Sequence, residues 1–251
     1  MDGTTAGATT LDRIRKLLAK AERAATPEEA RAYTDKAVQL MARHGVDMAL
    51  LAAAEPGRDE IGATRVDLAD PYTGGKARLL GWTAVALRCR AVLHQAAGGR
   101  VAAVTVFGFA TDRERVEVLF TSLLLQAAGE LARGRPGRAS ESVAAYRRSW
   151  LHGFAVSVHR RLSAAEAAAE AAGSGCAPRD PAGRQADAPR ADLVLAERRE
   201  RVDHAYAEAF PVLRRGHRPA LSGTGFSAGA AAGERADLGM RSVHGRRALG
   251  A

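Results

Sequence analysis

The chain has 251 residues, of which 47% are hydrophobic and 26% charged, and its formal net charge is +9. This length accommodates one large domain, or one domain with a small accessory module, and either can bury a core. No stretch reaches the roughly 18 apolar residues of a membrane span, and residues 1–25 lack the apolar region of a signal peptide. We therefore expect a cytoplasmic protein with no membrane partner.

Cysteine and arginine usage bear on cofactors and partners. Cys89 and Cys176 stand far apart without any Cys/His cluster, which indicates reduced thiols rather than a zinc site or a disulfide framework. The basic residues are 33 Arg and 4 Lys, and a basic surface attracts phosphate. Enrichment in Arg, Ala and Gly is also typical of a GC-rich genome, so charge alone does not establish a nucleic-acid partner. Residues 1–60 carry nine Lys/Arg and ten Asp/Glu, so the basic excess lies in the rest of the chain.

Two amphipathic helices are predicted at the N-terminus. Apolar residues at helical spacing indicate the first one, namely Leu11, Ile14, Leu17, Leu18 and Ala21. Thr26-Pro27-Glu28-Glu29 is a capping box with Pro at the first helical position, and it predicts a second helix that ends at Gly45, with Asp47 capping the next segment. Because the turn between them is short, the helices form an antiparallel hairpin whose apolar stripes need a third surface.

The hairpin resembles a known family. The segments that carry the resemblance are I-R-K-L-L-A-K-A-E at 14–22, T-P-E-E-A at 26–30 and A-V-Q-L-M-A-R-H-G-V-D at 37–47. They are similar to the signature of the domain of unknown function 2786 family, which occurs in actinobacteria and phages. This resemblance implies a fold element and no activity. Residues 76–240, with Y-R-R-S-W-L-H-G-F, F-P-V-L-R-R and G-F-x-x-G-x-x-x-G, are similar to the uncharacterised domain that often follows the hairpin in that family.

The middle of the chain mixes strands and helices. Alternation predicts a strand at Ile61–Leu68, followed by a helix from about Ala77 to Arg88. Residues 89–97 and 100–109 are strand-like on either side of Gly98-Gly99, a dipeptide suited to a tight turn. A second capping box, at 111–114, opens a helix that runs to Gly134. This order predicts an α+β fold, predominantly helical, in which a small antiparallel sheet is covered by helices.

The C-terminal part is predicted to be mainly helical. A long helix from Ser140 carries an apolar stripe of Tyr146, Trp150, Phe154, Val158 and Leu162. A short strand is predicted at 192–195, a helix at 198–210, and a last helix at 225–238 that aligns Gly225, Gly229 and Gly233. We divide the chain into a hairpin module (9–55), an α+β domain (60–172), a disordered linker or inserted loop (173–190), a C-terminal helical part packing on the α+β domain (191–240) and a basic tail (241–251).

No recognised catalytic, metal or cofactor motif is present, and we expect no cofactor. The glycines at 223–233 miss both nucleotide-binding fingerprints and favour close helix packing. His152 and His159 lie about 10 Å apart along a helix, too far for one metal, and His204 with Glu208 lacks a third ligand. Five acidic residues could converge in a nuclease-like cluster, although capping and solvated helix faces explain the last three: Asp67, Asp70, Asp112, Glu114 and Glu117.

Three functions remain open. The leading hypothesis is a non-catalytic accessory protein that associates with nucleic acid through Arg147, Arg148, Arg160, Arg161, Arg214, Arg215 and Arg218. The alternative is an interaction or oligomerisation module whose hairpin docks a protein partner or a second copy through Leu11, Ile14, Leu18, Tyr33, Leu40 and Met41. The third is an enzyme of unrecognised chemistry, which would show a pocket lined by convergent carboxylates or histidines.

Overall fold

The computed structural model of the chain describes residues 12–14, 16–17, 20, 26–55, 57–138, 140–175, 190–214 and 222–236. Its elements are α2 (Pro27–Ala54), β1 (Ile61–Asp67), α3 (Thr73–Ala86), β2 (Arg90–Gln95), β3 (Val101–Phe109), α4 (Ala110–Arg133), α5 (Val143–Gly175), α6 (Ala191–Ala209) and α7 (Phe226–Arg235). The predicted α+β class, predominantly helical with a small antiparallel sheet, is confirmed. Among the described residues, no helix combines the length and the apolar character needed to cross a membrane.

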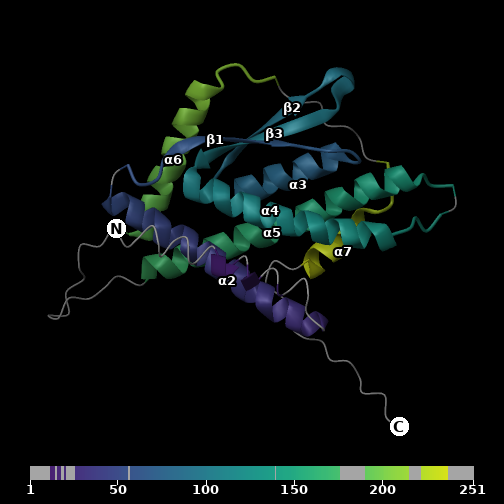
Figure 1. Cartoon of the computed structure of the whole chain (residues 1–251), viewed down its shortest axis with the longest axis horizontal. Helices are drawn as coiled ribbons and strands as arrows, with labels where there is room; N and C mark the ends of the chain where they lie inside the picture. The colour runs from purple at the N-terminus through teal and green to yellow at the C-terminus, as the bar shows by residue number, and fades with distance from the viewer. Residues whose placement is uncertain are drawn as a thin grey trace, which may run out of the picture.

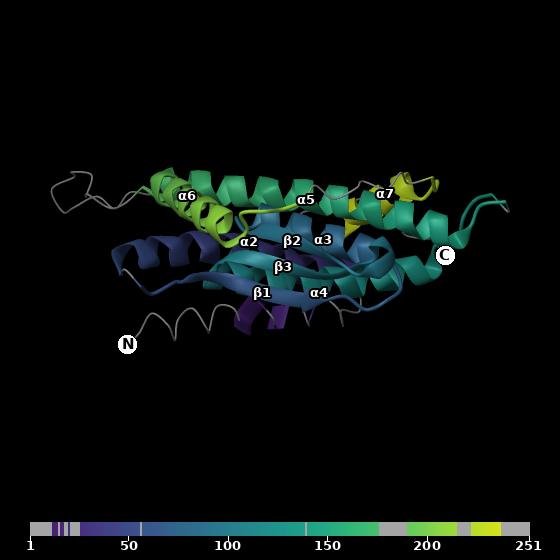
Figure 2. The same ribbon diagram turned by 90° about the horizontal axis from the view of Figure 1, so that it is seen from above.

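The strands form one antiparallel sheet in the order β1-β3-β2. Figures 1 and 2 show this sheet lying over α3 and α4, with α5 beside them. Because side chains alternate between the faces of a strand, β3 sends Val104 and Val106 into the main core and Phe107 and Phe109 to the other face. There α6 covers the two phenylalanines through Val202 and its neighbours. The central strand is therefore buried on both faces at its C-terminal end.

The apolar stripe of α5 lies in the main core. All five of its residues are buried, namely Tyr146, Trp150, Phe154, Val158 and Leu162. The Trp150 and Phe154 rings stack with their centroids 5.2 Å apart. α7 packs on this stripe, because Gly225, Gly229 and Gly233 lie against Tyr146, Trp150 and Phe154, and α3 packs on α5 as well.

The glycines of the last helix serve packing, as predicted. A Cβ at Gly229 would overlap the Trp150 carbonyl of α5, and one at Gly233 would lie 2.7 Å from the Phe154 carbonyl oxygen. Gly153 of α5 provides the matching space for the backbone at Phe226. Only glycine lets two backbones approach so closely. The four-residue spacing of these glycines therefore reflects a helix-to-helix contact and not a phosphate loop.

The second helix does not end at Gly45, so that prediction was wrong. It continues to Ala54, and Asp47 lies inside it instead of capping a following segment. Gly45 is there because it faces the Arg115 guanidinium, which a Cβ would overlap. The predicted cap at Thr26 is confirmed, because its hydroxyl accepts a hydrogen bond of 3.1 Å from the Glu29 N–H. The described residues between 12 and 20 are helical, whereas Leu11 and Leu18 fall outside the described residues.

Three boundaries in the middle of the chain differ from those predicted. The helix expected from Ala77 begins at Thr73. The β2–β3 connection is a short 3-10 turn at Ala97–Gly99 rather than a two-residue turn, although both of its glycines have the expected positive φ, 79° and 77°. The capping box at 111–114 does not form: Phe109 precedes α4, and Asp59 from the preceding loop accepts hydrogen bonds from the Thr111 N–H and hydroxyl.

The strand predicted at 192–195 was also wrong, because these residues form the first turns of α6. Ala191, Val194 and Leu195 recur at helical spacing and pack on Val46 and Ala49 of α2. A run of apolar residues this short does not distinguish strand from helix. The predicted linker overlaps α5, which continues to Gly175, and its residues 176–189 lie outside the described residues, as does the tail 241–251.

Candidate functional site

The described arginines among those predicted to contact nucleic acid do not share one surface. Arg161 is buried, and its Nη1 donates to the backbone oxygens of Gly233 and Ala236 at the end of α7. Arg160 is exposed and pairs with Glu234, with an Nη2 to Oε1 distance of 2.5 Å. Arg148 is also exposed, but its position is about 120° around the helix from that of Arg160. Of the remaining set, Arg147 is partly buried, Arg214 is exposed after α6, and Arg215 and Arg218 lie outside the described residues.

The apolar residues of the hairpin pack on the chain itself. Ile14 and Met41 are fully buried in the main core, while Tyr33 and Leu40 are partly buried. Through this core α2 contacts α4 and α5. For these four residues, the surface that covers the hairpin is therefore supplied by other helices of the same chain.

A row of four rings crosses α3, α5 and α7. Trp82 of α3 contacts His152 and His159 of α5, with centroid distances of 5.6 and 5.9 Å, and His152 contacts Phe226 at 5.4 Å. We call these four residues the ring row. Its members are only partly buried or, in the case of Phe226, exposed. The Arg78 guanidinium lies 6.0 Å from the Trp82 ring centroid, within the range of a cation–π contact.

Two of the three helices that form the ring row, α3 and α5, carry no carboxylate near it. α3 contains no Asp or Glu, and α5 contains none before Glu166. Arg148 precedes His152 by four residues and therefore lies on the same side of α5. Burial, followed by the charge of Arg78, lowers the pKa of His152, so this ring is neutral at pH 7. The positive charge beside the rings comes from the arginines.

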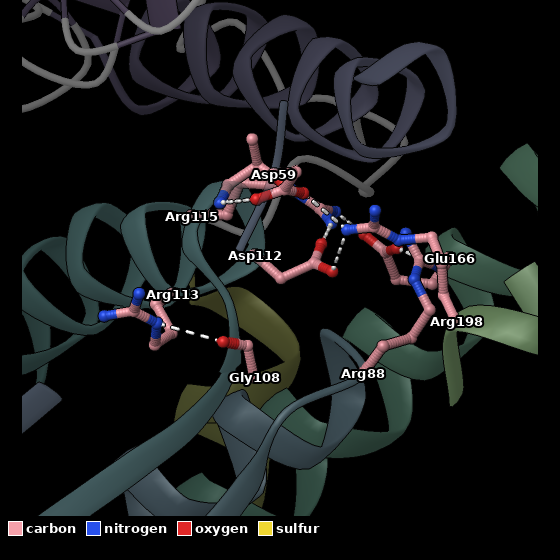
Figure 3. A network of polar contacts seen from close by, with 9 residues as sticks. Asp59, Arg88, Gly108, Asp112, Arg113, Arg115, Glu166 and Arg198 are labelled. Atoms are coloured by element: carbon pink, nitrogen blue, oxygen red, sulfur yellow. Dashed lines mark hydrogen bonds and ion pairs between the residues drawn. The ribbon is translucent and has the colours of Figure 1, made fainter. Parts of the chain in front are cut away.

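A second feature is a buried network of six charged side chains (Figure 3). Its members are Arg88, Arg115, Arg198, Asp59, Asp112 and Glu166. At its centre, the fully buried Arg115 donates from Nη1 to Asp112 at 2.8 Å and from Nη2 to Glu166. Three cations face three carboxylates, so the network as a whole is neutral.

The two ends of the network are held by different elements. From α6, Arg198 Nη2 donates to Asp59 Oδ2 at 2.7 Å and lies 3.3 Å from Asp112 Oδ2. Its guanidinium also stacks 3.6 Å from the Phe109 ring centroid. At the other end, Arg88 Nη1 lies 2.8 Å from Glu166 Oε2. This is an ion pair rather than a well-directed hydrogen bond, because Glu166 Oε2 has no hydrogen-bond donor among the described residues.

Two titratable groups beside the network are held neutral. Burial, then the charge of Arg115, lowers the pKa of His44. Burial, then the charge of Asp112, raises the pKa of the Cys89 thiol above its ordinary range. For Arg115 itself burial disfavours the charge, yet Glu166 and Asp112 outweigh it and raise the pKa. Arg115 therefore stays charged inside the network, and Cys89 is not a reactive thiolate.

A cavity opens at each end of the network. The larger, about 370 Å³, lies between the turn 85–90, α5 and α6, and Arg88 and Glu166 form part of its wall. The smaller, about 200 Å³, is lined by Asp59 and Arg198. Carboxylates and a histidine do converge on the larger cavity, namely Glu166, Glu170, Asp203 and His159. No group of His, Cys, Asp or Glu in the part of the chain that the structure describes could hold a metal ion.

The acidic cluster considered from sequence does not assemble. Asp112 is buried in the network, whereas Asp67 and Asp70 are exposed at the edge of the sheet beside Arg65 and Arg100. Glu114 and Glu117 are exposed on α4. His204 and Glu208 form an exposed pair on α6, 3.4 Å apart.

Sequence reasoning missed the network, although a signal for it existed. Glu166 continues the four-residue steps of the α5 stripe beyond Leu162, and Arg198 lies between Leu195 and Val202 on the buried side of α6. A charge inside an apolar stripe is a candidate for a buried ion pair, since such residues are rarely buried alone. For Arg88, in the turn after α3, we find no such signal.

The fold and these sites define a predominantly helical α+β protein with a buried ionic network and a cavity at each end of it. Residues 9–48 match the family model described as "Protein of unknown function (DUF2786)", which confirms the resemblance of the N-terminal hairpin. Comparisons with curated proteins and with solved structures found no match. The ring row, Arg88 and the larger cavity all lie outside the matched residues, so the family match brings no activity to them.

Proposed function

We propose that the chain associates with single-stranded nucleic acid through the ring row and the arginines beside it. The observation that carries this proposal is the Trp82 ring, partly exposed between two histidine rings with the Arg78 guanidinium over it. Aromatic rings offer stacking platforms to unpaired bases, and arginines contact the phosphates between them. Association with nucleic acid, the leading role predicted from sequence, is thus assigned to a different surface. Of the seven predicted arginines, this surface includes only Arg148.

The distribution of charge also supports nucleic-acid binding at the ring row. Across α3 and residues 143–165 of α5 there are basic side chains and no carboxylate, so no fixed negative charge on these segments repels phosphate. The paired arginines elsewhere contribute less, because Arg160 and Arg161 are bound to α7. Single strands fit better than duplex, because the bases of a duplex are stacked on one another and their faces are not available.

The hairpin alternative has less support. It needs an apolar stripe that is open to a partner, and the fully buried Ile14 and Met41 are covered by the chain itself. The third alternative, an enzyme, needs a pocket with convergent ionisable groups, and the larger cavity meets that geometric condition. The Cys89 thiol in its wall is not an activated nucleophile, since burial raises its pKa, so a binding role is the simpler proposal.

Fluorescence offers a direct test of nucleic-acid binding. The chain has two tryptophans, and Trp150 is buried, so quenching by a bound base reports on Trp82. We expect a thymidine oligonucleotide of about 15 nucleotides to quench this emission and to bind more tightly than a duplex of the same length. The affinity should fall linearly on a log–log plot against salt.

Matched variants then locate the surface. Arg148→Gln should reduce the magnitude of the salt slope by about 0.7, because it removes one phosphate contact to a single strand. Trp82→Leu, which keeps apolar bulk, should weaken binding by about tenfold or more. The control is Arg43→Gln, since Arg43 is exposed on α2 away from the ring row. Absence of binding at low salt, or equal effects of Arg148→Gln and Arg43→Gln, contradicts the proposal.

A further inference from the structure

The larger cavity has a charged wall that the nucleic-acid proposal does not use. It lies where the turn after α3 meets α5 and α6, and its charged residues are Arg88, Arg90, Arg199, Glu166, Glu170 and Asp203. Burial divides them into two groups. The side chains of Arg88 and Glu166 are only 6% and 8% exposed, whereas those of the other four are between 28% and 50% exposed. The cavity therefore has a deep end at Arg88 and a mouth formed by the rest.

At the deep end of the cavity, part of the Arg88 guanidinium has no hydrogen-bond partner among the described residues. Its Nη1 faces Glu166, but its Nε and Nη2 are shielded from solvent and have no hydrogen-bond partner among the described residues. A guanidinium carries five N–H donors, and a buried donor left without a partner is costly. At the mouth the arginines are matched, since Arg90 donates to Asp203 and Arg199 lies 3.9 Å from Glu170.

The two atoms without partners form one edge of a planar group. The N–H bonds of Nε and Nη2 point the same way, and this fork matches two oxygens of a carboxylate or a phosphate. We infer that the larger cavity binds a small molecule bearing a carboxylate or phosphate group, which the Nε/Nη2 edge of Arg88 holds at the deep end. Arg88 already lines the cavity, so a side-chain adjustment of the kind common on binding brings the edge to the ligand.

The rest of the wall sets further requirements on the ligand. A volume of about 370 Å³ is at the small end of ligand cavities, which suits a metabolite of at most mononucleotide size. At the mouth, the carboxylates of Glu170 and Asp203 accept hydrogen bonds from hydroxyl or amino groups, while Val85 and Ala86 offer apolar contact. The ligand is thus an anion at one end with hydrogen-bond donors at the other.

Calorimetry on the full chain tests this inference with four probes: inorganic phosphate, adenosine monophosphate, succinate and uncharged adenosine. We expect saturable binding of at least one anion and none of adenosine. Binding of the phosphate-containing probes identifies a phosphate ligand, and binding of succinate alone identifies a carboxylate. If no anion binds at about 10 mM, or if adenosine binds as well as its monophosphate, the inference is wrong.

Arg88→Lys is the decisive variant, because it keeps the charge beside Glu166 and removes the planar edge. The Kd for the anion should rise about tenfold or more, whereas Arg65→Lys, on the exposed edge of β1, should leave it unchanged. An unchanged Kd in Arg88→Lys overturns the inference. If this variant does not fold, Arg199→Gln at the half-exposed mouth replaces it, with an expected rise of about threefold.

Cross-measurements separate this site from the ring row. Arg88→Lys should retain oligonucleotide binding, and Trp82→Leu should retain anion binding, because Arg88 is not part of the ring row and Trp82 does not line the cavity. The two sites adjoin at His159, which belongs to both. Loss of both activities in either variant would show that one site serves both. Each proposal can therefore fail while the other stands.

Discussion

Gly45 of α2 packs directly against the guanidinium of Arg115 in α4, so closely that a Cβ at position 45 would overlap it. The glycine lies in the interior of a long helix and has no role in ending it. It makes room for a fully buried cation that pairs with Asp112 and Glu166. The residue whose type suggests a helix stop is thus part of the packing that joins the hairpin to the rest of the chain.

Gly45→Ala is expected to destabilise the fold. In an exposed helix the change to Ala adds about 1 kcal/mol of stability, but here the overlap with Arg115 should outweigh it and lower the free energy of unfolding by about 2 kcal/mol. Gly129→Ala in α4 is the matched control, since a Cβ at that position would have no neighbour within 4 Å, and it should stabilise by about 1 kcal/mol. Urea denaturation measures both. Stabilisation by Gly45→Ala would contradict the packing role.

Removing the central cation should be still more costly. Arg115→Met leaves Asp112 and Glu166 buried without their main partner, so we expect a loss of about 3–5 kcal/mol in the free energy of unfolding. Adding Glu166→Gln should recover part of this loss, because the two remaining arginines, Arg88 and Arg198, then face two carboxylates instead of three. Arg65→Met, at an exposed ion pair, should change stability by less than about 1 kcal/mol. Equal effects of the two arginine variants would show that the network is not stabilised by its pairing.

Stability should depend on pH through His44. Burial, followed by the charge of Arg115, lowers its pKa in the folded state, although Asp47 and Asp112 oppose the shift. The unfolded chain then takes up the proton at a higher pH than the folded chain does. The associated stability is fully present above a pH of about 6.5 and is lost as pH falls from there toward the folded pKa.

Chemical denaturation between about pH 7.5 and pH 5.5 measures this effect. The free energy of unfolding of the native chain should fall across that range, and His44→Gln should fall less steeply. His152 also has a lowered pKa, so part of the slope should remain in the variant. Parallel curves for the two proteins would exclude His44 as a source of the pH dependence.

The contact between α5 and α7 should depend on Gly229. Its replacement by Ala places a Cβ on the Trp150 carbonyl, and neither backbone can move without disturbing the helix, so we expect a loss of about 3 kcal/mol. Hydrogen exchange should show faster exchange across α7 than in the native chain. Gly74→Ala, at a position with open space around it, should leave α7 protected. Unchanged exchange in the Gly229 variant would exclude the close contact.

Much of the local structure could be predicted because it depends on local patterns. The cap at Thr26, the buried stripe through Trp150 and the glycine spacing of α7 all follow from which residues recur at helical intervals. The errors arise where a local rule competes with a distant contact. Local rules place Gly45 at a helix end and residues 192–195 in a strand, because the partners that explain them lie on other elements.

The sites show the same division between local pattern and distant contact. The sequence by itself determined most of the helices, the three strands of the sheet and the presence of charges within apolar stripes at Glu166 and Arg198. Only the tertiary structure decided which charges meet: Arg198 pairs with Asp59 across 139 residues, and Arg115 with Glu166 across 51. Helical and strand periodicities report which side of an element is buried, but not which element will cover it. Whether a buried charge is stable depends on the element that covers it, because that element brings the opposite charge within hydrogen-bonding distance.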